Sequence, residues 1–207
     1  MLSQIRPALV ATLFFTLLLG VGYPLAVTGI AHLAFPAQAA GSLIRDASGQ
    51  VVGSALIGQN FGKPEYLHPR PSAAGTDGYD ASNSSGSNLG PLNPDLAKRI
   101  AKDTAGLQAE GAGPVPADAV TTSASGLDPD VSPANAARQI ARLAAARTAP
   151  VSEIEKIIAD NTDGPWLGVF GQAHVNVLKT NLALDAAWPM AHASARSGSN
   201  ESKPGGR

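Results

Sequence analysis

The sequence predicts a single N-terminal transmembrane helix followed by one small mixed α/β domain, which we expect on the extracytoplasmic side of the membrane. No Asp, Glu, Lys or Arg occurs between Arg6 and Arg45, and residues 8–35 are almost wholly apolar. The rest of the chain has the length of one ordinary domain, and helical patterns alternate with short strand-like runs along it. We therefore expect an anchor at 1–40, a soluble domain at 41–188 and a disordered tail at 189–207.

The anchor is long enough to cross a bilayer. Residues 8–27 alone supply the roughly 20 apolar residues that span a hydrocarbon core of about 30 Å. Gly20, Gly22 and Pro24 interrupt this stretch. Such residues loosen or kink a membrane helix, and glycines also allow a neighbouring helix to approach closely.

The residues that flank the anchor indicate its orientation in the membrane and whether it is cleaved. Arg6 is the only charged side chain near its start, so the positive-inside rule places the N-terminus in the cytoplasm. The alternative is a secretory signal peptide, because residues 37–39 (Ala-Gln-Ala) fit a small-residue cleavage pattern. The apolar stretch exceeds the about 7–15 residues of a signal core, which favours an uncleaved anchor. Cleavage would leave a free secreted binding domain, and an intact-mass measurement distinguishes the two.

The composition excludes several classes of function. The chain has no cysteine, so disulfides, thiol nucleophiles and thiolate metal sites are excluded. Its net charge is −1 and no basic stripe interleaved with aromatic residues occurs, so a nucleic-acid partner is not expected. With 22 glycines and 16 prolines the domain should be rich in loops, and an interface with a larger partner would help to stabilise it.

The elements of the soluble domain follow from turn and cap signals. A hairpin is expected from 41–44 and 51–58 around a turn at 46–49. Residues 61–94, rich in Pro, Gly, Ser and Asn, predict a long ordered surface loop that meets a partner. Asn93-Pro94-Asp95 begins a helix that runs to Gly111. The remaining expectations, in chain order, are a strand at 119–123, a turn at 125–129, a helix at 133–147 begun by Ser132-Pro133, a helix at 153–161 begun by a Ser152–Glu155 capping box, strands at 166–170 and 175–178, and a last helix at 181–188.

The motif search yields no catalytic residue and no metal site. The sequence lacks a phosphate loop, an HExxH pair and a nucleophile elbow, and its histidines have no metal-ligand spacing. Arg70, fixed between two prolines, could aim at a carboxylate or phosphate, or it could be a solvated loop residue. Gln139, beside Arg138 and Arg142 on a predicted helix, could bind a polar ligand or could simply lie on the helix surface.

Several short motifs occur together in a fixed order, and with them the chain resembles the C subunits of the bacterial Kdp potassium-transporting P-type ATPase from Arg6 to about Asp185. Each motif is weak alone, but the set is highly specific. The motifs are residues 6–9 (RPAL), 22–25 (GYPL), 41–44 (GSLI), 53–61 (GSALIGQNF), 70–73 (RPSA), 86–89 (GSNL), 123–128 (SASGLD), 175–178 (VNVL) and 181–185 (NLALD).

The resemblance implies a non-catalytic accessory subunit of an ATP-driven, high-affinity potassium uptake complex in the bacterial inner membrane. Its partners would be a channel-like potassium subunit, an ATP-hydrolysing P-type subunit and a small single-helix subunit. The GYPL motif makes the anchor a packing surface for these subunits and for lipid, and the soluble motifs supply candidate interface residues. These candidates are Gly20, Gly22, Tyr23 and Pro24 in the anchor, and Arg70, Ser72, Asn88 and Leu89 in the domain.

Two hypotheses about the domain remain open. The family is described as a catalytic chaperone that raises the ATP affinity of the hydrolysing subunit, and Gln139 is the position that the resemblance links to nucleotide. No cofactor would be tightly bound, and ATP would be held only within the complex. In the second hypothesis the domain is a structural brace or gate over the extracellular potassium entrance, because a domain outside the cell meets little ATP.

Overall fold

The computed structural model describes residues 2–46, 48–110 and 113–189, in two compact units, Met1–Ser54 and Ala55–Arg207. The division follows Ser54, so the predicted hairpin groups with the anchor segment rather than with the soluble domain. The predicted disordered tail, apart from Pro189, lies outside the described residues.

The first unit is dominated by a continuous helix, Ile5–Ala34, that is long and apolar enough to cross a membrane by length and composition. Its helical turns widen just before Pro24, where the N–H of Tyr23 donates to the carbonyl of Leu18, five residues back. Proline has no N–H to donate, and a π-turn accommodates such a break without ending the helix. The helix consists of α1 (Ile5–Leu17), η2 (Leu18–Gly22) and α2 (Tyr23–Ala34); η1 (Leu2–Gln4) precedes it and a short α3 (Pro36–Ala39) follows.

The predicted hairpin is confirmed in the same unit. β1 (Leu43–Arg45) and β2 (Val51–Ser54) pair antiparallel, although β2 ends at residue 54 and not at 58. The Asp46 carboxylate accepts from the backbone N–H groups of Ser48 and Gln50, at 2.8 and 3.0 Å, and so closes the turn.

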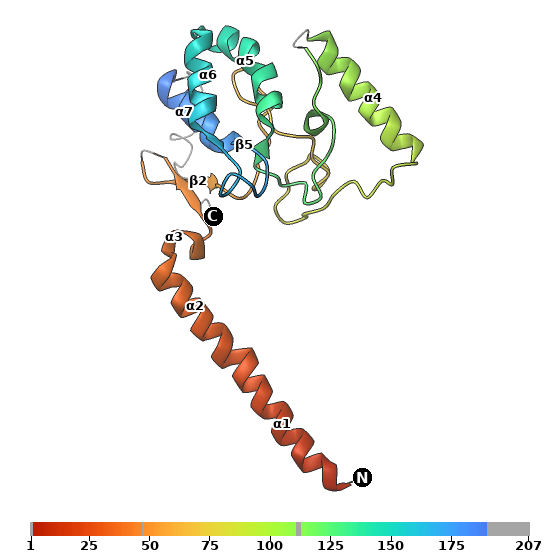
Figure 1. The fold of residues 1–207 in the computed structure, drawn as a ribbon, viewed down its shortest axis with the longest axis vertical. Coiled ribbons are helices and arrows are strands. Elements are labelled where there is room, and N and C mark those ends of the chain that lie inside the picture. Colours follow the sequence, from red (N-terminus) through yellow and green to blue (C-terminus); the bar gives the residue numbers. More distant parts are fainter. Residues whose placement is uncertain (1, 47, 111–112, 190–207) are drawn as a thin grey trace, which may run out of the picture. The chain divides into compact units, whose positions relative to one another are not determined.

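The second unit packs helices around a small antiparallel sheet (Figure 1). Strand β5 is central, and β3 and β4 pair with its two edges. The elements of this unit are α4 (Pro94–Ala109), η3 (Ala117–Ala119), β3 (Asp130–Val131), α5 (Pro133–Arg147), α6 (Val151–Asp160), β4 (Thr162–Asp163), β5 (His174–Asn176) and α7 (Val177–Ala187).

Local caps begin two of the helices as predicted. The Asn93 side chain accepts from the N–H of Asp95 at the start of α4, and Ser132 accepts from Asn135 at the start of α5. In each case proline stands at the first helical position, where its missing N–H costs nothing. The helix start is therefore encoded within four residues.

Two other helix starts were predicted wrongly. The expected capping box is absent, because α6 already begins at Val151 and Ser152 lies inside its first turn. Helix α7 begins at Val177 rather than Asn181, because Asn176 accepts from the N–H of Lys179 and caps it. Residues 177–178 thus belong to a helix although their apolar run predicted a strand.

Two predicted strands are also wrong. In place of a strand at 119–123 the chain forms η3 and an irregular stretch. Residues 166–170 fold back on themselves, because Trp166 pairs with Phe170 across a tight turn. An apolar run therefore marked a turn here and not a strand.

The core lies where α5, α6 and α7 meet β5 and the 61–94 loop. That loop is not only a surface feature as predicted, because Leu67 and Ala74 within it are fully buried. The buried core residues are Leu67, Val131, Ala136, Leu143, Ala144, Ile154, Ile158, Val175, Val177 and Leu184.

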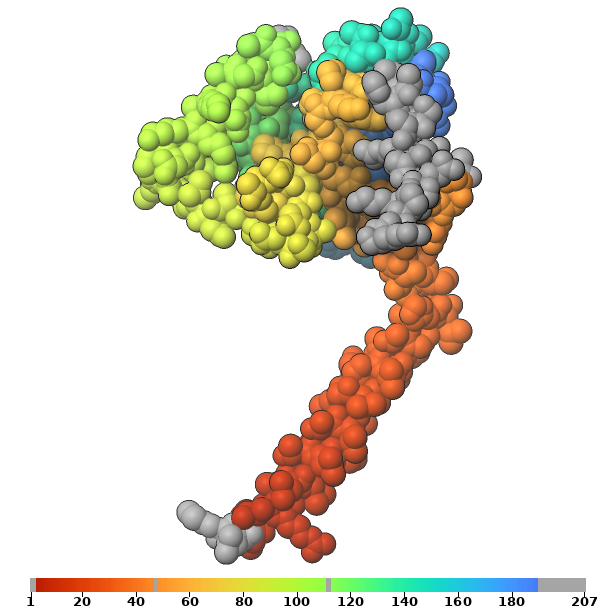
Figure 2. All heavy atoms as spheres, turned by 180° about the vertical axis from the view of Figure 1, so that it is seen from behind, coloured from red at the N-terminus to blue at the C-terminus, as the bar shows by residue number. Residues whose placement is uncertain are grey.

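Helix α4 lies to one side of this core. It has no buried residue, and its half-buried face includes Leu96, Ile100 and Leu107. Arg138 of α5 donates to the carbonyl of Leu107 at 2.8 Å. Figure 2 shows this helix, in green, at the outer edge of the unit.

The buried start of the 61–94 loop is held by side chains rather than by a neighbouring strand. Asn181 of α7 accepts from the N–H of Leu67 at 2.7 Å and donates to its carbonyl at 3.0 Å. Arg147 of α5 donates to the carbonyl of Glu65 at 2.7 Å, and its side chain is completely buried. Unpaired buried backbone groups are costly, so these side chains fix the path of the loop.

Replacing Asn181 with alanine should destabilise the soluble unit by about 2–4 kcal/mol, because it leaves both polar groups of the Leu67 backbone buried and unpaired. Urea unfolding of the full chain in detergent, followed by circular dichroism, measures the change. Asn83→Ala, at an exposed loop position, is the matched control and should stay within about 0.5 kcal/mol of the unaltered chain. Equal unfolding midpoints for the two variants would contradict this account.

Candidate functional site

The candidate site is a cavity of about 330 Å³ between α4, α5 and the 60–79 part of the loop. Its size lies at the small end of the range for small-molecule sites, which is about 300–1,000 Å³. The lining is largely polar. Its charged and titratable members are His68, Arg70, Asp77, Tyr79, Glu110, Arg138 and Arg142.

Gln139 lies in the wall of this cavity and is already fully hydrogen-bonded. Its Oε1 accepts from the N–H of His68 at 2.8 Å and from the Arg142 guanidinium. Its Nε2 donates to the carbonyl of His68 at 3.1 Å and to Asn135 Oδ1 at 3.3 Å. An amide offers two donors and two acceptor positions, so Gln139 fixes the loop backbone rather than pointing free into the cavity.

The two neighbouring arginines extend this hold. Arg142 donates to the carbonyls of Pro64 and Tyr66, at 2.5 and 3.0 Å. Burial lowers the pKa of Arg142, but an arginine remains charged at neutral pH. Arg138 bonds the end of α4, while its buried Nε has no acceptor among the residues that the structure describes.

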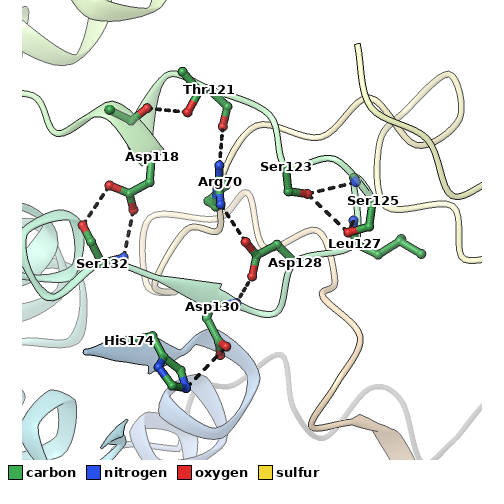
Figure 3. Close-up of polar contacts among 12 residues, drawn as sticks. Arg70, Asp118, Thr121, Ser123, Ser125, Leu127, Asp128, Asp130, Ser132 and His174 are labelled. Carbon is green, nitrogen blue, oxygen red and sulfur yellow. Dashed lines mark hydrogen bonds and ion pairs between the residues drawn. The ribbon is translucent and has the colours of Figure 1, made fainter. Parts of the chain in front are cut away.

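Arg70 is anchored within the domain instead of being a free loop residue (Figure 3). Its guanidinium forms an ion pair with Asp128 at 2.7 Å and reaches the carbonyl of Thr121 at 3.4 Å. The Tyr79 hydroxyl donates to the Arg70 carbonyl at 2.7 Å, and burial raises the pKa of Tyr79, so the hydroxyl keeps its proton. The Nε of Arg70 is buried and lacks an acceptor among the described residues, as the Nε of Arg138 does.

Ser72 is the centre of a tight loop-to-loop contact. Its hydroxyl donates to the carbonyl of Gly126 at 2.6 Å and accepts from the N–H groups of Ala74 and Tyr79. Gly126 adopts φ +66°, and a Cβ there would lie 2.5 Å from the carbonyl oxygen of Ser85. Only glycine therefore allows these loops to approach so closely.

The other predicted interface residues lie apart from the cavity. Asn88 is exposed with φ +52°, and Leu89 is half-buried beside it. In the first unit Gly20, Gly22, Tyr23 and Pro24 lie at the widened turn and are exposed along the helix.

A second polar cluster borders the ion pair of Arg70. Asp118 accepts from the N–H and the hydroxyl of Ser132, both at 2.8 Å, and so holds the start of α5 (Figure 3). His174 lies 3.7 Å from Asp130, and burial raises the pKa of that carboxyl group. Among the described residues no group of three His, Asp or Glu side chains is placed to hold a metal ion.

Sequence reasoning missed most of the partners of these residues. Asp128 lies in the SASGLD motif, and Asn181 begins the NLALD motif, so motif membership was the available signal. Arg147 carried no such signal. Its ion pair with Asp185 at 2.8 Å links positions 38 residues apart.

Stability should fall as the pH drops below 6.5, in part because of His68. Burial is the main cause that lowers the pKa of His68 below its ordinary value of 6.5, and the Arg142 charge adds to it. The unfolded chain then takes up the proton first, so the contribution of this group is complete above pH 6.5 and is lost as the pH falls towards the folded pKa. Urea unfolding between pH 8 and 5 measures this. The free energy of unfolding of His68→Gln should fall less steeply with decreasing pH than that of the unaltered chain. If the two free energies of unfolding fell equally with pH, His68 would not contribute to the pH dependence.

The comparison with known proteins covers nearly the whole chain. A family model described as KdpC, the c chain of the K+-transporting ATPase, matches residues 5–186. The potassium-transporting ATPase KdpC subunit of Caulobacter vibrioides (strain NA1000 / CB15N) is 62% identical over 190 residues, which cover 91% of this chain and 96% of that protein. The KdpC subunits of Beijerinckia indica and Gemmatimonas aurantiaca are 59% and 54% identical, over 92% and 90% of this chain and 97% and 94% of their own. These matches confirm the resemblance drawn from the short motifs, and the chain belongs to the KdpC family, the c chains of K+-transporting ATPases.

Proposed function

We propose that this chain is a non-catalytic accessory subunit of an ATP-driven potassium uptake complex, and that its soluble domain acts as a rigid brace in the assembly. The N-terminal helix would lie in the bacterial inner membrane with its N-terminus in the cytoplasm. Family membership and the names of the similar proteins support a place in a potassium-transporting ATPase. The partners would be the channel-like, the ATP-hydrolysing and the small single-helix subunits.

The hydrogen bonds to the 61–94 loop support the proposal that the domain is a rigid brace. The polar side chains that approach the 61–94 loop from α5 and α7 bind its backbone. Gln139 binds the N–H and the carbonyl of His68, and its other two hydrogen bonds join it to Arg142 and Asn135 of α5. Arg142 and Asn181 bind the backbone of the neighbouring loop residues. These hydrogen bonds would have to break before the side chains could bind a ligand, which costs free energy. The arrangement therefore favours a rigid domain over a ligand-binding one.

The part of the loop that we propose for a partner is residues 80–93, which we call the arch. Ser84 and Ser85 in its first half donate to the carbonyls of Ser125 and Ala73, so residues 87–93 would make the contact. The arch follows the buried start of the loop and leads into α4. Asn88 is exposed on it, and Leu92 is 97% exposed. A partner that binds the arch would remove the apolar side chain of Leu92 from water. We therefore propose that the arch docks on the channel-like subunit.

In the membrane, the widened turn would supply the packing surface. Gly20 and Gly22 present no side chain, and Tyr23 and Pro24 follow at once. Small residues let helix backbones approach closely, and a neighbouring helix satisfies the carbonyl that the proline leaves free.

Charges placed on the arch should weaken assembly. Asn88→Asp keeps a residue type that tolerates the positive φ of this position, and Leu92→Glu buries a charge if the arch is covered. We expect the amount of the other Kdp subunits that co-purifies with the tagged chain to fall at least about tenfold. Ala101→Glu, on the exposed side of α4, is the control and should assemble normally. Normal assembly of both arch variants would overturn the brace docked through the arch.

A nucleotide-dependent chaperone is the second candidate, and the cavity supplies an observation for it. Arg70 and Arg138 both line the cavity, and each keeps a buried Nε–H without an acceptor among the described residues. Phosphate oxygens are strong acceptors for arginine. A nucleotide held beside Gln139 would place its phosphate near the guanidinium groups of these two arginines.

The chaperone candidate predicts a change in ATP dependence at normal assembly. Arg138→Gln and Gln139→Ala should raise the ATP concentration for half-maximal hydrolysis by the assembled complex about threefold or more, while Arg138→Lys, which keeps the charge, should have a smaller effect. Unchanged ATP dependence in complexes that contain all subunits would exclude this candidate.

Protease added to either side of sealed vesicles bears on both candidates, because a domain digested only from outside is separated from cytoplasmic ATP.

A further inference from the structure

The connection between β4 and β5, residues 164–173, exposes a group of large apolar side chains that the core does not use. The tip of this connection, residues 166–170, reads Trp-Leu-Gly-Val-Phe. Its apolar side chains are 62–76% exposed: Trp166, Leu167, Val169 and Phe170. Scattered apolar residues are ordinary on a protein surface, but four within five positions form a continuous patch.

The tip is built as a fixed turn. The N–H of Trp166 donates to the carbonyl of Phe170 at 2.8 Å, and the N–H of Phe170 donates back at 3.0 Å. The two rings lie 5.8 Å apart, centroid to centroid. Leu167 and Gly168 both adopt positive φ, at +53° and +74°, which turns the chain over the tip. The apolar side chains are therefore presented in a defined geometry before any partner binds, which reduces the entropy cost of binding.

The charges around the tip indicate what would cover it. Residues 164–173 include no Asp, Glu, Lys or Arg. The nearest acidic groups along the chain before it are Asp160, which pairs with Lys156 at the surface, and Asp163, which is exposed. A turn that binds anionic lipid usually carries Lys or Arg near its apolar tip, and none stands in this connection. Because Asp160 is paired with Lys156, Asp163 is the exposed acidic group next to the tip, and it suits a basic group at the rim of a partner protein better than an anionic bilayer surface.

We propose that the tip inserts into an apolar socket with a basic rim on another subunit of the potassium-transporting ATPase. This inference rests on the proposed assembly role and adds a second contact to the arch. Aromatic and aliphatic side chains in a central pocket carry most of the binding energy in many interfaces.

The test uses a variant that leaves the turn intact. L167N/V169S removes the two apolar side chains at the top of the tip, which are 72% and 76% exposed, and asparagine tolerates the positive φ of position 167. We expect unchanged unfolding of the chain and about a 100-fold loss in affinity for the other subunits, as the loss of two buried apolar side chains implies. V151S, which removes an exposed apolar side chain from α6, is the control and should assemble normally.

A labelling experiment identifies what covers the tip. The chain has no cysteine, so V169C provides a single reactive thiol on it, and A101C on α4 serves as the exposed control. A water-soluble maleimide should label V169C in the purified full chain in detergent and in phosphatidylcholine–phosphatidylglycerol vesicles, but not in the assembled complex. Protection in vesicles without the other subunits would assign the tip to the bilayer and overturn the proposal, and so would labelling in the complex.

Failure of this inference is distinguishable from failure of the assembly role. If the unaltered chain does not co-purify with the other subunits, the proposed function fails, and this inference fails with it. If the unaltered chain and L167N/V169S co-purify equally, only the socket is overturned.

Discussion

The soluble domain depends on one constraint: a partly buried piece of loop has no strand beside it, so side chains must satisfy much of its backbone. The carbonyls of residues 64–68 and the N–H groups of residues 67 and 68 bind Gln139, Arg142 and Arg147 of α5 and Asn181 of α7. Burial without these partners would cost more than the apolar packing of Leu67 returns. These bonds fix the loop to both helices, and they thereby set the position of the rest of the loop and of the cavity wall that it forms.

The hub of this arrangement is Arg147, the last residue of α5. It pairs with Asp185 at 2.8 Å, donates to the carbonyl of Trp188 at 3.0 Å, and lies over the ring of Tyr66 at 5.3 Å from its centroid. A buried guanidinium is tolerated only when it is paired and hydrogen-bonded, as it is here. The end of α5, the end of α7 and the start of the loop are therefore held together at one point.

The fixed loop explains why the short family motifs occur as a set. The RPSA motif meets the SASGLD motif through Ser72 and Gly126, and the GSALIGQNF motif meets it where Gly58 lies against the backbone of Asp128. Ser72, in the first of these contacts, also lines the cavity that Gln139 borders. Residues that seem suited to a ligand in the sequence are thus largely occupied by the fold, and the surfaces left for partners are the arch and the tip of the β4–β5 connection.

The sequence by itself determined the features that depend on near neighbours. These are the apolar length of the N-terminal helix, the hairpin turn at Asp46, and the starts of α4 and α5, where a cap and a proline act within four residues. The motifs also sufficed to identify the family. Tertiary structure alone decided the rest: that Gln139 binds a backbone 71 positions away, that Asn176 caps α7, and that the apolar run at 166–170 turns back on itself. The physical reason is that such groups find their hydrogen-bond partners only after distant segments have packed together. The spacing of residues along the chain does not predict which segments these are.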